Sequence, residues 1–224
     1  MRLAESKLTA AEVEDDLQLR DAQLARACAL APAGNRGWSA EWIMLREILR
    51  KPREMGTICP SSARLGRLMA SFVNREEEGT IVELGAGTGA VTAALIQRGV
   101  SPGRLIVIEK SELLAEHLSE RFPKICVRHA DAAEQPKPFN QAGTINTIVS
   151  CLPLRSLPAA QVAQIAETWA PLLAPGGRVI QFTYAPFNCT AWLATGLVRI
   201  SSNTVWLNLP PARVEVFAAP ILPK

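Results

Sequence analysis

The residues from Thr80 to Thr92 constrain most strongly how this chain can fold. They read Thr-Ile-Val-Glu-Leu-Gly-Ala-Gly-Thr-Gly-Ala-Val-Thr, so a short apolar run leads into three alternating glycines and then into a helical pattern. This order predicts a strand, a tight turn and a helix, as in nucleotide-binding α/β folds. Glycines have no Cβ to keep a ligand away from the backbone, and a helix that begins there directs free N–H groups at that ligand.

The spacing of the glycines narrows the kind of ligand. The third glycine comes two residues after the second, which departs from the dinucleotide pattern G-x-G-x-x-G, and no Gly-Lys-Ser/Thr ending of a phosphate loop follows. The pattern Glu-x-Gly-x-Gly-x-Gly instead resembles the first motif of the S-adenosylmethionine-dependent methyltransferases. This resemblance implies that the cofactor is bound by Glu83, Gly85, Ala86, Gly87 and Gly89.

The length and composition fit one folded α/β domain with a short extension. The chain has 224 residues, of which 48% are hydrophobic and 20% charged, and its net charge of +3 gives no general argument for nucleic acid. No apolar run approaches the ~18 residues needed to cross a bilayer, and the N-terminal stretch is too acidic for a secretory signal. The five cysteines have no metal-binding spacing, so we expect reduced thiols, no metal and a cytoplasmic protein.

Changes in the sequence pattern along the chain predict three parts. Residues 1–37 form a helical extension, which has the form of a capping box near its start and ends in a stretch with one proline and two glycines. Residues 38–75 contain amphipathic helices that face the membrane or the substrate. Residues 76–224 form the S-adenosylmethionine-binding catalytic domain.

The segment 38–53 combines tryptophans with a cluster of basic residues, among them Trp42 and Arg46. Such a helix suits an interface with anionic lipid headgroups. It equally suits a core-packing helix with a solvated basic end, because cations are favourable at helix C-termini. Ser61 follows in a Pro-Ser-Ser turn before a helix, where it either caps that helix or presents its hydroxyl to a ligand.

From Thr80 onward short strands alternate with helices, which predicts a parallel sheet with helices on its faces. Glu109 ends the strand 104–109, where an acidic side chain can accept hydrogen bonds from ribose hydroxyls. Asp131, with Ala132 beside it, lies just past the strand 124–128 and is placed to bind an adenine amino group. Apolar residues at 205–209 and 214–217 predict a closing hairpin-like pair of strands.

The chain turns sharply after the predicted strand 145–150, because Pro153 cannot continue the ladder. Open α/β sheets bind ligands at this carboxyl edge, where backbone carbonyls of the turn can hold an amine that faces the cofactor. Ser150 and Leu152 are therefore candidate catalytic residues. Tyr184, the only tyrosine, ends the predicted strand 178–184 and is the candidate for holding the amine through its hydroxyl or ring face.

Further short motifs occur at Pro60-Ser61-Ser62, Leu152-Pro153-Leu154, Gln181-Phe182-Thr183-Tyr184 and Asn208-Leu209-Pro210-Pro211-Ala212-Arg213. With them the chain resembles the bacterial phospholipid N-methyltransferases, class I enzymes related to the rRNA adenine dimethyltransferases. The resemblance implies a Rossmann-like fold with a mostly parallel seven-stranded sheet, helices on both faces and an antiparallel C-terminal strand. It also implies methylation of phosphatidylethanolamine, in up to three steps to phosphatidylcholine, by a protein peripherally bound to the inner face of the cell membrane.

The same resemblance favours the membrane-facing interpretation of residues 38–53. Trp42, Arg46 and Arg213 are then the expected substrate-binding residues, because basic side chains suit a lipid phosphate. The expected partners are an anionic membrane surface and a phospholipid, without nucleic acid or metal.

Other methyl acceptors and other classes of protein also fit the sequence. Ornithine lipid or a soluble amine would keep the chemistry and change the substrate. An rRNA adenine dimethyltransferase would be expected to have an aromatic residue for stacking on a flipped base where Leu154 stands. A third alternative is a regulatory protein that binds the cofactor without catalysis. Asn146 replaces an acidic residue expected at the start of the fourth strand, which leaves the identity of the lipid open.

Overall fold

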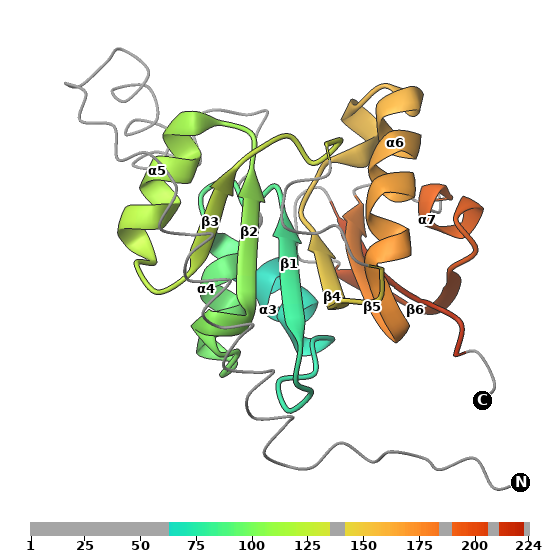
Figure 1. The fold of residues 1–224 in the computed structure, drawn as a ribbon, viewed down its shortest axis with the longest axis horizontal. Coiled ribbons are helices and arrows are strands. Elements are labelled where there is room, and N and C mark those ends of the chain that lie inside the picture. Colours follow the sequence, from blue (N-terminus) through green and yellow to red (C-terminus); the bar gives the residue numbers. More distant parts are fainter. Residues whose placement is uncertain (1–62, 135–141, 184–189, 206–210, 222–224) are drawn as a thin grey trace, which may run out of the picture. The chain divides into compact units, whose positions relative to one another are not determined.

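The computed structural model describes residues 63–134, 142–183, 190–205 and 211–221, and its strands form one seven-stranded sheet in the order β3-β2-β1-β4-β5-β7-β6 (Figure 1). The strands are β1 Thr80–Leu84, β2 Leu105–Glu109, β3 Cys126–His129, β4 Ile145–Ser150, β5 Leu173–Thr183, β6 Val198–Val205 and β7 Ala212–Ala218. The helices are α3 Ala63–Ser71, α4 Ala90–Gln97, α5 Glu112–Arg121, α6 Ala159–Trp169 and α7 Ala191–Ala194.

Strands β1 to β5 run parallel to one another, whereas β7 is antiparallel to both β5 and β6. The predicted fold class is therefore confirmed: the sheet is mostly parallel and ends in antiparallel strands. All five residues of β2 are buried, as expected for a strand that is covered on both faces.

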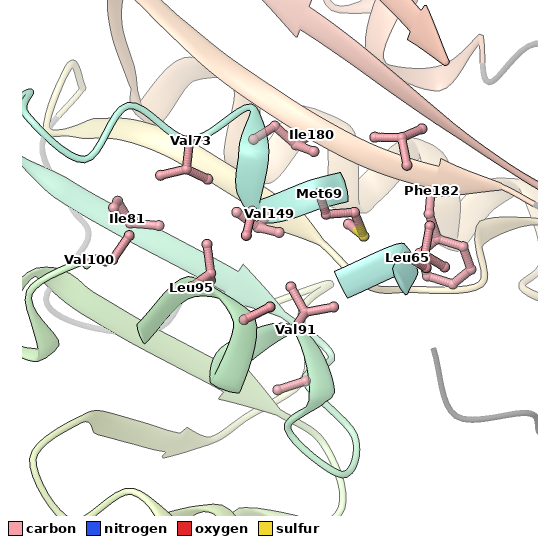
Figure 2. Packing of buried hydrophobic residues seen from close by; sticks show 14 of the residues in the cluster. Leu65, Met69, Val73, Ile81, Val91, Leu95, Val100, Val149, Ile180 and Phe182 are labelled. Carbon is pink, nitrogen blue, oxygen red and sulfur yellow. The ribbon is translucent and has the colours of Figure 1, made fainter. Parts of the chain in front are cut away.

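Helix α3 buries its apolar side against one face of the sheet. Leu65 and Met69, four residues apart on that helix, are fully buried. Figure 2 shows them packed between Leu95 of α4 and the side chains of Ile180 and Phe182 from β5. Burial of each such side chain stabilises the fold by roughly 1.5–3 kcal/mol. Although α3 falls within the predicted segment 38–75, its apolar residues belong to the core of the sheet.

The opposite face of the sheet carries α6, with α7 packed beside it (Figure 1). Trp169, at the last position of α6, is fully buried, and its indole N–H donates to the carbonyl of Ala132 at 2.7 Å. This bond links the end of α6 to the loop that follows β3.

One predicted strand boundary is wrong, and one strand was not predicted. β5 begins at Leu173 and not at the predicted residue 178, because residues 174–177 form a bulge inside it: Ile145 of β4 pairs with Leu173, and Thr147 already pairs with Arg178. The predicted strand 205–209 lies outside the described ranges except for Val205, and the structure has a strand at Val198–Val205 that the sequence analysis did not predict. β6 is an exposed edge strand rich in polar residues, so it lacks the apolar run on which the prediction relied.

One expectation about the cysteines is also wrong, because the sulfur of Cys126 is in a disulfide. Within the ranges that the structure describes, no helix has the length and apolar character of a membrane span. The predicted helices of residues 1–53 lie outside those ranges.

Candidate functional site

The glycine turn after β1 adopts a conformation that only glycine takes easily. Gly85, Gly87 and Gly89 have φ values of 70°, 57° and 80°, in the left-handed region. The N–H of Gly85 donates to the carbonyl of Ile108 at 2.8 Å, and the N–H of Gly89 donates to Ala86 at 2.9 Å. Helix α4 begins directly afterwards at Ala90, so the predicted strand–turn–helix is confirmed.

Glu109 lies at the end of β2 and joins this turn. One carboxylate oxygen accepts from the N–H of Gly87 at 2.9 Å, and the other accepts from the N–H of Ser111 at 2.9 Å. A Cβ built at Gly87 would meet no atom within 4 Å, so the space beside that residue is open. The open space at Gly87, beside a carboxylate, fits the methionine part and the ribose of S-adenosylmethionine.

Glu83 is fully buried in β1 beneath the turn. Its carboxylate accepts from the hydroxyl of Thr92 at 2.7 Å, and the thiol of Cys151 donates to it at 3.6 Å. Burial raises the pKa of Glu83 from 4.5 to about 7. Glu83 therefore ties β1 to α4 and to the segment after β4. Burial likewise raises the pKa of the Cys151 thiol, so this cysteine stays protonated.

Asp131 is held at the end of β3, next to the end of β2. One of its oxygens accepts from the N–H of Ala133 at 2.9 Å, and the other lies 2.7 Å from the ammonium of Lys110. This hydrogen bond to Lys110 keeps the pKa of Asp131 below its usual value. The neighbouring Ala132 is buried and is anchored by Trp169. Glu109 and Asp131 thus lie at adjacent strand ends, as the sequence predicts.

Ser150 and Leu152 lie on the other side of the glycine turn. Ser150, the last residue of β4, pairs with Leu84 of β1 and is fully buried, and its hydroxyl has no hydrogen-bond partner among the described residues. The side chain of Leu152 packs directly against Gly85, where an added Cβ would collide with it. Both predicted residues therefore border the turn that fits the cofactor.

Gln181 of β5 is a residue of this site to which the sequence analysis assigned no role. It is fully buried, and its amide donates to the carbonyl of Leu152 at 3.0 Å and to that of Phe182 at 2.7 Å. Its side-chain oxygen accepts from the indole of Trp192 at 3.3 Å. Gln181 fixes the backbone after β4. Its place in the Gln-Phe-Thr-Tyr motif is the sequence signal that pointed to it.

The expected substrate-binding residues are described only in part. Arg213 of β7 pairs with Thr183, the last residue of β5, so it lies on the side of the sheet where the parallel strands end. The remaining predicted site residues lie outside the described ranges, namely Trp42, Arg46, Ser61 and Tyr184.

Comparison with known proteins agrees with this geometry. Residues 81–177, which include the glycine turn, Glu109, Asp131 and the segment after β4, match the family model of the methyltransferase domain. The prediction of a class I methyltransferase with S-adenosylmethionine as cofactor is confirmed at the level of the class.

One relative of this chain is named for its lipid substrate. This chain is 27% identical over 176 residues to an ornithine lipid N-methyltransferase from Singulisphaera acidiphila, and the alignment covers 76% of this chain and 92% of the relative.

Solved structures share the fold. A TehB-like SAM-dependent methyltransferase from Corynebacterium glutamicum aligns with a TM-score of 0.60 at 16% identity, over 80% of this chain and 98% of its own. A 1,6-didemethyltoxoflavin-N1-methyltransferase from Burkholderia thailandensis, solved with bound 1,6-didemethyltoxoflavin and S-adenosylhomocysteine, aligns with a TM-score of 0.60 at 13% identity. That alignment covers 85% of this chain and 94% of the other.

Proposed function

We propose that this methyltransferase transfers methyl groups from S-adenosylmethionine to the primary amine of an ornithine lipid. The observation that carries the proposal is the similarity to an ornithine lipid N-methyltransferase over 92% of that protein's length. This similarity favours the ornithine-lipid alternative of the sequence analysis over phosphatidylethanolamine, which no comparison supports. We retain the expectation that a protein with a lipid acceptor acts at the cytoplasmic surface of a membrane.

The residues at the carboxyl edge of the sheet would hold the cofactor. The open space beside Gly87 would receive its methionine part, Glu109 would accept hydrogen bonds from its ribose, and Asp131 would bind its adenine. When bound, S-adenosylmethionine supplies a methyl group on a positively charged sulfur.

The segment after β4 would position the amine. The hydroxyl of Ser150 has no partner among the described residues, and the carbonyl of Leu152 is fixed in place by Gln181. The Ser150 oxygen could accept an N–H hydrogen of a neutral amine and so direct its lone pair toward the methyl group, whereas the Leu152 carbonyl already accepts from Gln181 and from the N–H of Leu154. Such alignment contributes much of the rate, by analogy with effective molarities equivalent to roughly 7–11 kcal/mol.

The amine must lose its proton before it can attack. A primary ammonium that enters a poorly hydrated site has its pKa lowered, because burial disfavours the charged form. The fully buried residues at the end of β4 provide such surroundings. The proton is therefore expected to leave to solvent as the headgroup enters.

The test is mass spectrometry of lipids after incubation of the purified protein with S-adenosylmethionine and liposomes. One set of liposomes contains ornithine lipid and a second contains phosphatidylethanolamine, at equal amine content. We expect methylated ornithine lipid and unchanged phosphatidylethanolamine. The variant Glu109→Gln, which should bind the cofactor poorly, controls for contaminating enzymes. Methylation of phosphatidylethanolamine alone, or of neither lipid, would overturn the proposed acceptor.

A further inference from the structure

A groove with a volume of about 750 Å³ follows α6 on the face of the sheet opposite to α3. One wall is α6, with Val162 and Ala163, and the other contains Ala194 of α7 and Leu197, which follows that helix. Figure 1 shows α6 and α7 side by side. Most of the lining side chains are apolar, so the groove suits a hydrocarbon more than a polar ligand.

One end of the groove lies near the turn that follows β4. Its lining includes Leu154, two residues after Leu152, and continues past the whole of α6 to Pro171 and Pro220. The 11 residues of α6 span roughly 16 Å at 1.5 Å per residue. This length is close to half of the ~30 Å hydrocarbon core of a bilayer, the depth that one lipid leaflet occupies.

Exposed apolar side chains flank the groove. Leu193, Val198 and Ile221 have 37%, 59% and 79% of their surface exposed, and each is the chain neighbour of a lining residue. Large apolar side chains that gather on a surface mark contacts with proteins, membranes or apolar ligands. Their position beside the groove extends its apolar surface outward.

We propose that this groove binds an acyl chain of the lipid acceptor while the amine lies at the turn of Ser150 and Leu152. The proposal rests on the proposed function, because a lipid acceptor must place its chains somewhere next to the site. Arg155 lines the end of the groove that adjoins the turn, where its cation can face the carboxylate of an ornithine headgroup. Amine, carboxylate and chain would then follow one another along a continuous surface.

The first experiment measures binding without catalysis. The probe is 11-(dansylamino)undecanoic acid, a fluorescent single-chain amphiphile, titrated into the purified full chain. Ala163→Trp and Ala194→Trp place an indole in the groove from opposite walls, and both alanines are exposed, so the fold should accept them. We expect each variant to bind the probe about tenfold more weakly, because the apolar volume is filled. Gln164→Trp, exposed on α6 but outside the lining, is the matched control and should bind as the wild type does.

The second experiment uses turnover with two acceptors, ornithine lipid and an ornithine derivative that carries an acetyl group in place of the acyl chains. Ala163→Trp should raise the KM for the lipid about tenfold, since contacts to the chain are lost, and leave the KM for the acetyl derivative unchanged. Equal losses on both acceptors would overturn the proposal.

The two proposals fail in different ways. If the wild-type protein methylates no lipid but the groove variants weaken the binding of the probe, the proposed function falls and the acyl-binding groove stands. If ornithine lipid is methylated and Ala163→Trp has no effect on either readout, the groove proposal falls alone. Light scattering tests whether a second copy of this chain occupies the groove. If the wild type were a dimer and Ala163→Trp a monomer, the groove would be a contact between two copies and the proposal would be overturned.

Discussion

The backbone N–H of Gly87 donates a hydrogen bond of 2.9 Å to the carboxylate of Glu109, across 22 residues of sequence. This bond joins the ends of β1 and β2 and holds the glycine turn in its left-handed conformation. The carboxylate that is placed for the ribose therefore also organises the backbone that would receive the methionine part of the cofactor.

Replacement of this carboxylate should weaken the binding of the cofactor. Glu109→Gln leaves one acceptor oxygen for two backbone N–H groups, those of Gly87 and Ser111, and removes a charge that suits ribose hydroxyls. Hydrogen bonds to charged groups contribute roughly 1.5–3 kcal/mol, so we expect affinity for S-adenosylhomocysteine to fall at least about tenfold by calorimetry. Glu112→Gln, an exposed residue of the same segment, should bind normally. Equal affinity in Glu109→Gln and the wild type would contradict the ribose assignment.

Alanine at two glycines of the turn should separate binding from stability. Gly87→Ala forces a side chain into the left-handed region, which costs roughly 1–2 kcal/mol, and its Cβ points into the open space beside the turn. We expect a modest loss of stability with a large loss of cofactor binding. Gly85→Ala adds the collision with Leu152, so its free energy of unfolding should fall further. Urea unfolding and calorimetry on both variants check this order, which would be wrong if Gly87→Ala bound the cofactor normally.

The pKa of Glu83 predicts a dependence of stability on pH. Because burial raises this pKa from 4.5 to about 7, the folded protein holds a proton in that range that the unfolded chain has lost. Stability should therefore fall as the pH rises from about 4.5 to about 7, by about 3 kcal/mol at 1.36 kcal/mol per unit. Glu83→Gln cannot ionise, so the free energy of unfolding of the wild type relative to this variant should fall over that range. Urea unfolding of both proteins at pH 5, 6, 7 and 8 measures this difference. If the free energy of unfolding changed equally with pH in the wild type and in Glu83→Gln, the pKa of Glu83 would not be raised.

Ser150 offers a test of function that should leave the fold intact. Its buried hydroxyl has no hydrogen-bond partner among the described residues, so Ser150→Ala removes no internal bond and should leave the unfolding temperature unchanged or slightly raised. If the hydroxyl accepts a hydrogen bond from the substrate amine, kcat should fall about tenfold while the affinity for S-adenosylhomocysteine is kept. Thermal unfolding, calorimetry and lipid turnover measure the three quantities, and an unchanged kcat would remove Ser150 from the site.

The sequence predicts the elements whose signal is local. The glycine turn follows β1 and Glu109 ends β2, and these two apolar strands stand out because both of their faces are covered. β6 carries no such signal, since an edge strand exposed to solvent tolerates polar residues at nearly every position.

Contacts between distant segments could not be predicted from the chain. The bond from Gln181 to the carbonyl of Leu152 joins residues 29 positions apart, and that from Trp169 to Ala132 spans 37. These partners depend on the order of strands and on which helix covers which face. A single sequence does not contain that information in any local pattern.

The position of β7 also affects how this protein can be made. β7 follows β6 in the chain but lies between β5 and β6 in the sheet. During synthesis β6 therefore leaves the ribosome before β7, the strand that joins it to the rest of the sheet. The backbone hydrogen bonds of β6 to the sheet can form only after residues 212–218 have been made. A chain that ended before residue 212 would leave the edge of β5 that pairs with β7 open. Such an open edge strand can pair with other chains and aggregate.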